Sequence, residues 1–183
     1  METTRTSEYI AANIHVLKQG AALMRRLDDR AYGNHALGER SAIGVHLRHA
    51  LDFYTLFFEG MTTGRIDYDR RARDKRIEQD RGFAIERSEQ LIEQLRQLGD
   101  IDADIWVKVD VCADAGDPAA YSRSTLRREL QALISHTIHH YALIAYLMRI
   151  QDLETDPGFG VAPSTLDYWQ REGMLRQTGA ETA

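Results

Sequence analysis

The sequence is poor in the residues that mark disulfide-bonded, disordered or membrane-spanning proteins. Its 183 residues include one cysteine and three prolines. An intramolecular disulfide is therefore excluded, and long uninterrupted secondary-structure elements are expected. No apolar run approaches the roughly 20 residues that a membrane helix needs, and residues 1–8 lack the apolar stretch of a secretory signal. These absences predict a cytoplasmic protein without a membrane segment.

The charge balance excludes another class of partner. The chain has 23 Lys and Arg against 28 Asp and Glu, which gives a net charge of -5. A negatively charged protein is repelled by polyanions, so we expect neither nucleic acid nor an anionic membrane surface as a partner. With 43% hydrophobic residues and no Pro/Gly-rich linker, residues 1–183 are predicted to form a single globular domain.

Four long segments have the apolar periodicity of amphipathic helices. They cover approximately residues 7–28, 42–61, 81–98 and 125–150. Their expected N-caps are Ser7, Ser41 and either Ser124 or Thr125. Four amphipathic helices joined by longer connections predict an all-α fold, a four-helix bundle.

Shorter features lie between and after these helices. Residues 105–111 alternate between apolar and polar side chains, and with residues 119–122 they predict a short hairpin between helices three and four. Residues 32–40 and 65–80 are expected to be irregular. A short terminal helix is predicted from Thr165 to Gln170, with Ser164 as its cap.

Five of the seven histidines lie in two of the predicted helices. His136 and His140 differ by only about 40° around the helix axis, so both can reach one ion. His139 lies about 100° from His140 and should face elsewhere. Imidazole is the commonest side-chain ligand of transition metals. A third histidine from a facing helix would complete the open three-ligand arrangement typical of catalytic zinc.

The second helix offers two candidates for this third ligand. His46 lies nearer the centre of the apolar face, whereas His49 lies at its edge, near Phe53. The pattern alone favours His46, but a metal ligand in a cleft need not lie at the centre of the face. Both remain open on this basis, as does a third interpretation in which the histidines are structural and bind no metal.

Two motifs resemble the DinB-like (YfiT-like) metalloenzymes, namely Ser-Ala-Ile-Gly-Val-His-Leu-Arg-His-Ala-Leu-Asp at residues 41–52 and His-Thr-Ile-His-His at residues 136–140. In that family of four-helix bundles, three histidines hold a divalent metal. The second-helix ligand is followed by two mostly apolar residues and often by an acid, which matches His49. The resemblance therefore implies His49, His136 and His140 as metal ligands, with His46 as the substitute for His49.

The resemblance also implies a class of function. It suggests a site for zinc, nickel or iron in a homodimeric enzyme that acts on a small-molecule substrate. The reaction would be transfer of a low-molecular-weight thiol or metal-dependent hydrolysis. Ala142 stands where the related iron-bearing domains of sulfoxide synthases have a glutamate, which argues against their chemistry. The alternative is a non-catalytic, dimeric bundle that binds a metal or a small ligand.

No residue is assigned a catalytic role, although several polar groups lie near the histidines in the predicted helices. Asp52 could orient a ligand imidazole, but a solvated carboxylate beside Arg48 and Glu59 is the favoured interpretation. Glu129 is the better-placed carboxylate, unless it pairs with an arginine. Tyr54 and Tyr141 are expected in the core, as are most aromatic side chains of helical bundles.

The charged run at residues 69–76 allows two interpretations. Its arginines could bind an anionic substrate group. The favoured interpretation is a solvated linker in which acids and bases pair with each other. Cys112 is expected to be a small apolar filler, because no neighbouring group in the sequence would activate it.

Overall fold

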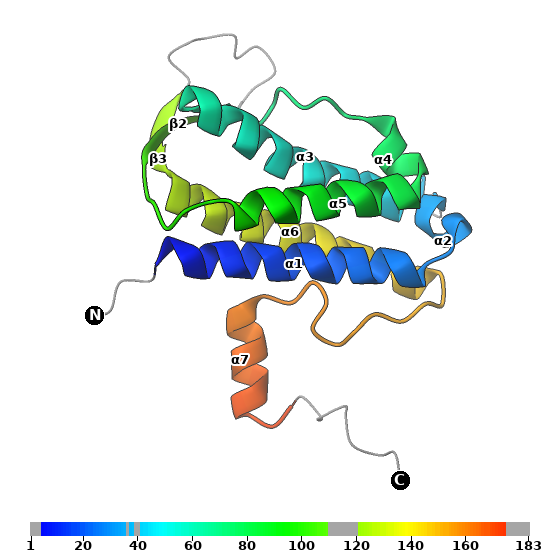
Figure 1. Ribbon diagram of the computed structural model, residues 1–183. Coiled ribbons are helices and arrows are strands. Elements are labelled where there is room, and N and C mark those ends of the chain that lie inside the picture. The colour runs from blue at the N-terminus through cyan, green and yellow to red at the C-terminus, as the bar shows by residue number, and fades with distance from the viewer. Residues whose placement is uncertain (1–4, 36, 39–40, 110–120, 175–183) are drawn as a thin grey trace.

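The computed structural model describes residues 5–35, 37–38, 41–109 and 121–174. These residues are mostly helical, with seven helices and one three-stranded sheet (Figure 1). In chain order the elements are α1 (Thr6–Arg26), α2 (Asp29–Gly33), α3 (Ile43–Thr63), β1 (Arg65–Asp67), α4 (Lys75–Gln79), α5 (Arg81–Arg96), β2 (Asp104–Lys108), β3 (Ser122–Thr125), α6 (Leu126–Ile150) and α7 (Pro163–Arg171).

The four longest helices, α1, α3, α5 and α6, cover the four predicted helical segments. α1 packs against α5 and α6, and α3 packs against α6 and α5. Each helix turns its apolar stripe inward, because burial of that stripe is the main source of stability for such helices. The buried side chains at these contacts include Leu17, Met24, Leu47, Phe57, Leu91, Leu95, Leu130 and Ile144.

The predicted N-caps are only partly correct. α6 is capped by Thr125, whose Oγ1 accepts from the backbone N–H of Arg128 at 3.2 Å. α1 and α3 instead begin after Arg5 and Ala42, and neither has a side-chain cap. The hydroxyl of Ser41 donates to the carbonyl oxygen of Gly38, so it serves the preceding loop.

The terminal helix α7 also begins earlier than predicted. Ala162 is its N-cap, and Pro163 is its first residue. Proline is suited to this position because its fixed φ angle matches the helix and its missing N–H would have no helical partner. Ser164 is therefore inside the helix, and its predicted role as a cap is wrong.

The sheet confirms the predicted hairpin in part and adds a third strand. β2 lies within the predicted first strand except at Asp104, but β3 overlaps the predicted returning strand only at Ser122. β2 and β3 are antiparallel, with Ile105 opposite Ser124. Residues 110–120, which include Cys112 and the connection expected between the two strands, lie outside the described residues. β1 pairs in parallel with β2, with Arg65 beside Trp106. The segment at residues 65–80 is thus not wholly irregular, since it contains β1 and α4. Similarly, α2 covers the start of the loop expected at residues 32–40.

The segment between β1 and α5 folds back against α3. α4 lies so close to α3 that a Cβ atom added at Gly44 would be 2.3 Å from the carbonyl oxygen of Glu78. The hydroxyl of Tyr32 donates to the carbonyl oxygen of Ile77. These contacts hold a charged connection beside the face of α3 that carries the histidines.

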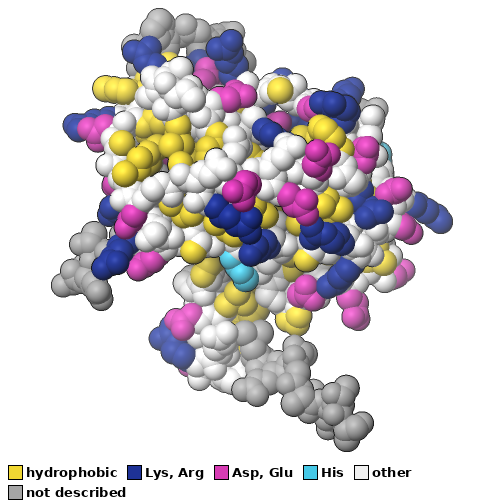
Figure 2. Space-filling model, in the orientation of Figure 1, with side chains coloured by type: hydrophobic (Ala, Val, Ile, Leu, Met, Phe, Trp, Pro, Cys, Tyr) yellow, Lys and Arg dark blue, Asp and Glu magenta, His cyan; other side chains and the backbone are white. Residues whose placement is uncertain are grey.

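The surface agrees with the mixed charge of the sequence. Figure 2 shows Lys and Arg side chains interspersed with Asp and Glu over the face formed by α1 and α5. Within the described ranges, no helix has both the length and the apolar character needed to cross a membrane.

Candidate metal centre

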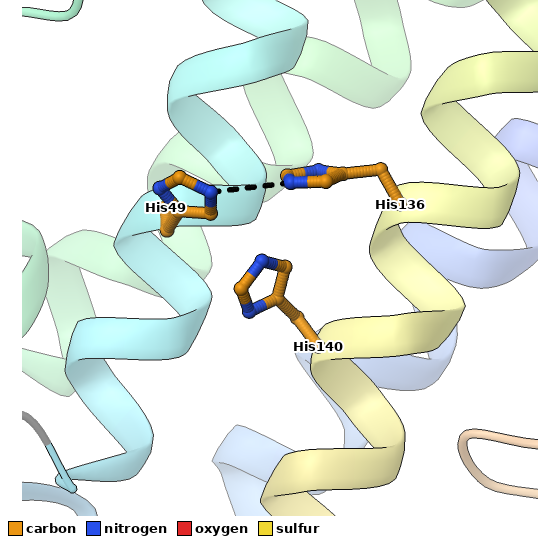
Figure 3. Close-up of side chains that lie close together, drawn as sticks. All are labelled: His49, His136 and His140. Atoms are coloured by element: carbon orange, nitrogen blue, oxygen red, sulfur yellow. Dashed lines mark hydrogen bonds between the residues drawn. The ribbon is translucent and has the colours of Figure 1, made fainter. Parts of the chain in front are cut away.

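Three histidines from two helices meet between α3 and α6. His49 projects from α3, and His136 and His140 project from successive turns of α6 (Figure 3). The two helices pack against each other. Side chains four residues apart share a helix face, so α6 presents both of its imidazoles to α3. Residues far apart in the sequence thereby form one cluster. Its third member is His49, which the resemblance implied, and not His46, which the helical pattern alone favoured.

The distances within this cluster suit a metal ion. The Nε2 atoms of His49 and His136 are 3.1 Å apart. One ligand atom from each of the three histidines can be chosen so that all lie within 4.8 Å of one another. Two nitrogen ligands of a tetrahedral zinc ion are about 3.3 Å apart. The three imidazoles could therefore hold one metal ion.

The two other histidines of these helices lie beside the cluster. The Nδ1 atom of His46 is 3.1 Å from the Nδ1 atom of His140, so His46 can exchange a hydrogen bond with it. His139 is exposed, as expected, and only its ring edge approaches His140. The geometry groups His49 with the α6 pair and places His46 next to that group.

Burial keeps the imidazoles neutral. Desolvation, followed by the charges of neighbouring groups, lowers the pKa of His49 to about 3, with His136 and Arg71 among the causes. The pKa of His140 is lowered to about 3 and that of His136 to about 4, again mainly by burial. A metal ligand must be a neutral imidazole, so these side chains are ready to bind a cation at neutral pH.

An aromatic wall closes one side of the cluster. The Phe53 ring stacks on His136 with ring centroids 3.9 Å apart, and Tyr68 stacks on the Phe53 ring at 4.9 Å. The Tyr68 hydroxyl donates to Glu129 at 2.9 Å, and the Ser124 hydroxyl donates to the same carboxylate. Among the described residues, Glu129 is thus bonded to two hydroxyls and to no arginine, and the aromatic rings lie between it and His136.

Asp52, on α3, belongs to a largely buried ion-pair cluster. Arg48 donates to Asp52 at 2.9 Å and also to Glu78, which ties α3 to α4. Asp52 is only 5% exposed, so the prediction that its carboxylate is solvated is wrong. The predicted pairing of Asp52 with Arg48 is correct. Burial raises the pKa of Asp52, while Arg48 opposes this shift.

Arg71, in the charged run, contacts the histidine cluster. Its Nη1 donates to Nδ1 of His49, and its guanidinium carbon lies 5.9 Å from the centre of the Phe53 ring. Arg76 instead pairs with Asp74, as the favoured interpretation of a self-paired linker requires. The sequence indicated that an arginine in this run could bind an anion, but it did not indicate which one.

The remaining sequence candidates are in the core. Tyr54 is fully buried, and its hydroxyl donates to the side-chain oxygen of Asn13 at 2.7 Å. Tyr141 is 2% exposed and stacks on Phe159. Both are core residues, as expected. Phe53 and Tyr68 are site neighbours that the helical pattern did not identify, because their roles depend on contacts between different elements.

An apolar groove opens beside His46. It has a volume of about 500 Å³ and is lined by His46, by Leu37, Gly38 and Ser41, and by the C-terminal half of α6. Three of its apolar side chains, Leu37, Tyr146 and Ile150, are largely exposed. The histidine cluster thus lies between the aromatic wall and this groove.

Comparison with known proteins adds little. No family model matches the chain, and no solved structure matches it. A 108-residue stretch is 32% identical to FK506-binding protein 5 of the fungus Rhizopus delemar and covers 58% of this chain. The chain spans only 28% of the length of that relative. This likeness does not show a family.

Proposed function

We propose that this chain is a metal-dependent enzyme of the DinB-like type, a four-helix bundle in which His49, His136 and His140 bind one divalent ion. The observation that carries this proposal is the meeting of three imidazoles from α3 and α6, with ligand atoms within 4.8 Å. The lowered pKa values of these histidines support it, because they keep the ligands neutral.

The donor atoms fit such an ion. Imidazole suits zinc, nickel and iron, which are the metals expected from the sequence. The Nε2 atoms of His49 and His136 face each other at 3.1 Å, a separation that suits two ligands of one ion. Three protein ligands leave a coordination position open. A cation at this site would supply Lewis acidity and lower the pKa of a coordinated water or thiol.

The neighbouring side chains favour a reaction that needs little help from a carboxylate base. Asp52 is paired with Arg48, and Glu129 is bonded to Tyr68 and Ser124. A thiol activated by the cation needs no further base, whereas hydrolysis commonly uses one. We therefore propose transfer of a low-molecular-weight thiol to a small-molecule substrate as the first reaction class and hydrolysis as the second.

One observation favours a second candidate, a non-catalytic dimer that binds a metal or a small ligand. The apolar groove beside His46 exposes 66% of Leu37, 65% of Tyr146 and 49% of Ile150. Exposed apolar patches often mark contacts with another chain or a ligand. Sedimentation would detect the dimer, and Tyr146→Ser should then weaken it without changing metal binding.

The metal site can be tested by binding measurements. The metal-free protein is titrated with Zn²⁺, Ni²⁺ and Co²⁺, and bound metal is measured by elemental analysis. We expect about one ion per chain in the wild type, and His49→Gln should weaken binding by more than about a hundredfold, because even loss of a group that orients a ligand costs 10–100-fold.

His46→Gln is the matched control, since it removes an imidazole from the same helix. It should weaken binding by about 10–100-fold, less than His49→Gln does, because it removes a neighbour of His140 and not a ligand. If His46→Gln abolished binding and His49→Gln did not, His46 would be the third ligand. A wild-type protein that takes up none of these metals would contradict the proposal.

A further inference from the structure

We infer that Arg71 binds the carboxylate of a substrate beside the metal, an inference that rests on the proposed metal site. It names a substrate class, namely small molecules that carry a metal-binding atom and, a few bonds away, a carboxylate. Arg71 reaches the cluster from the segment between β1 and α4, and its guanidinium lies against His49 and near the face of Phe53.

The hydrogen bonds of Arg71 leave most of its donors unused. A guanidinium is a planar fork of several N–H donors that matches the two oxygens of a carboxylate. Arg71 uses Nη1 for His49, while its Nε is buried and has no hydrogen-bond partner in the described part of the chain. Buried donors without partners are rare, which indicates that an acceptor is missing here.

The carboxylates near Arg71 do not supply that acceptor. Asp52 and Asp69 attract the guanidinium electrostatically, but no ion pair joins Arg71 to a described residue. Asp52 pairs with Arg48 instead. A divalent cation held by three neutral imidazoles would add positive charge beside Arg71. An anionic ligand would relieve this repulsion, because opposite charges at short range stabilise each other.

The contact with His49 also differs from a contact that orients a metal ligand. A histidine that binds metal through Nε2 carries its proton on Nδ1 and donates it to an acceptor. Arg71 has no acceptor atom, so its bond to Nδ1 of His49 requires the proton on Nε2, the atom that faces His136. Metal binding at Nε2 and the bond from Arg71 are therefore alternatives, and a metal at Nε2 leaves the guanidinium to bind another acceptor.

Matched thiols test the inference. The Co²⁺-loaded protein is titrated with 3-mercaptopropionate and with its neutral methyl ester, and binding is followed by the absorption of the cobalt site. We expect the wild type to bind the acid at least about tenfold more tightly than the ester, since a hydrogen bond to a charged group is worth at least that much. In Arg71→Gln, this preference should disappear.

The control variant is Arg70→Gln, which removes an exposed arginine from the adjacent position and should leave the preference unchanged. A preference that persists in Arg71→Gln would mean that the carboxylate chelates the cobalt, and it would overturn the inference. Equal affinity of the wild type for both thiols would overturn it as well, while cobalt binding would still support the proposed function.

Affinity for Co²⁺ gives a second readout in the same proteins. Arg71→Gln should bind Co²⁺ at least as tightly as the wild type, because the substitution removes a positive charge and a competing hydrogen bond. Loss of Co²⁺ from Arg71→Gln alone would make Arg71 a structural support and overturn the inference. Loss from the wild type, or a cobalt spectrum that neither thiol changes, would instead contradict the proposed metal site with its open position.

Discussion

Two arginines border the histidine cluster, and their surroundings differ. Arg48, on α3, lies between two carboxylates, Asp52 and Glu78, in a largely buried cluster. Arg71, on the connecting segment, contacts a neutral imidazole and an aromatic ring, without an ion pair to any described residue. The same type of side chain is thus paired with carboxylates at position 48 and lacks such a pair, among the described residues, at position 71. Carboxylate partners thus distinguish an arginine with a structural role from one whose guanidinium is available to a ligand.

The largest effect should come from removal of the balanced arginine. Arg48→Ala leaves Asp52 and Glu78 without their cation, and we expect it to lower the free energy of unfolding by about 3 kcal/mol, as for other broken buried ion pairs. Urea denaturation of the metal-free protein measures this loss.

The control for this variant is Arg87→Ala. Arg87 is half-buried and donates to the neutral acceptors Thr55 and Gln90, so its loss should lower the free energy of unfolding by about 1 kcal/mol or less. Equal losses in the two variants would remove the contrast between a charge-balanced and an ordinary arginine.

An intermediate effect should follow a fall in pH, which acts on the three imidazoles of the histidine cluster. The pKa values of His49 and His140 are lowered to about 3 and that of His136 to about 4, whereas unfolded histidine titrates near 6.5. Between these values the unfolded chain binds more protons than the folded one. The metal-free protein should therefore lose stability as the pH falls from about 6.5 to about 4.

Urea denaturation across this pH range, in the presence of a chelator, checks this expectation. His140→Gln removes one of the shifted imidazoles and should make the pH dependence less steep. A free energy of unfolding that stays constant from about pH 6.5 to pH 4 would show that the cluster takes up protons as easily in the folded as in the unfolded chain.

The smallest change in stability should come from Arg71→Gln. Because Arg71 is half-buried on a connecting segment and has no ion pair within the described ranges, we expect the free energy of unfolding to change by about 0.5 kcal/mol or less. A loss as large as that expected for Arg48→Ala would mean that both arginines are structural, and the comparison between them would fail.

The helices were largely predictable because their signals are local. Apolar side chains at helical spacing in α1, α3, α5 and α6 mark the buried faces, and Thr125 caps α6 as one of two expected residues. The same periodicity put His136 and His140 on one face. The N-terminus of α1 and the strand β1 were missed because remote partners decide them: Ser7 N–H bonds to Asp100, and β1 pairs with β2 across intervening helices.

The sequence by itself determined that the protein is mostly helical and that its histidines gather on two helices, because helical periodicity is set by neighbours along the chain. Only the tertiary structure decided which groups surround them. Packing of α3 on α6 brought His49 to His136 and His140, and the return of the segment after β1 brought Arg71, but not Arg76, to His49. Contacts between segments depend on how whole elements pack, so helical periodicity could not choose between His46 and His49, or between Arg71 and Arg76.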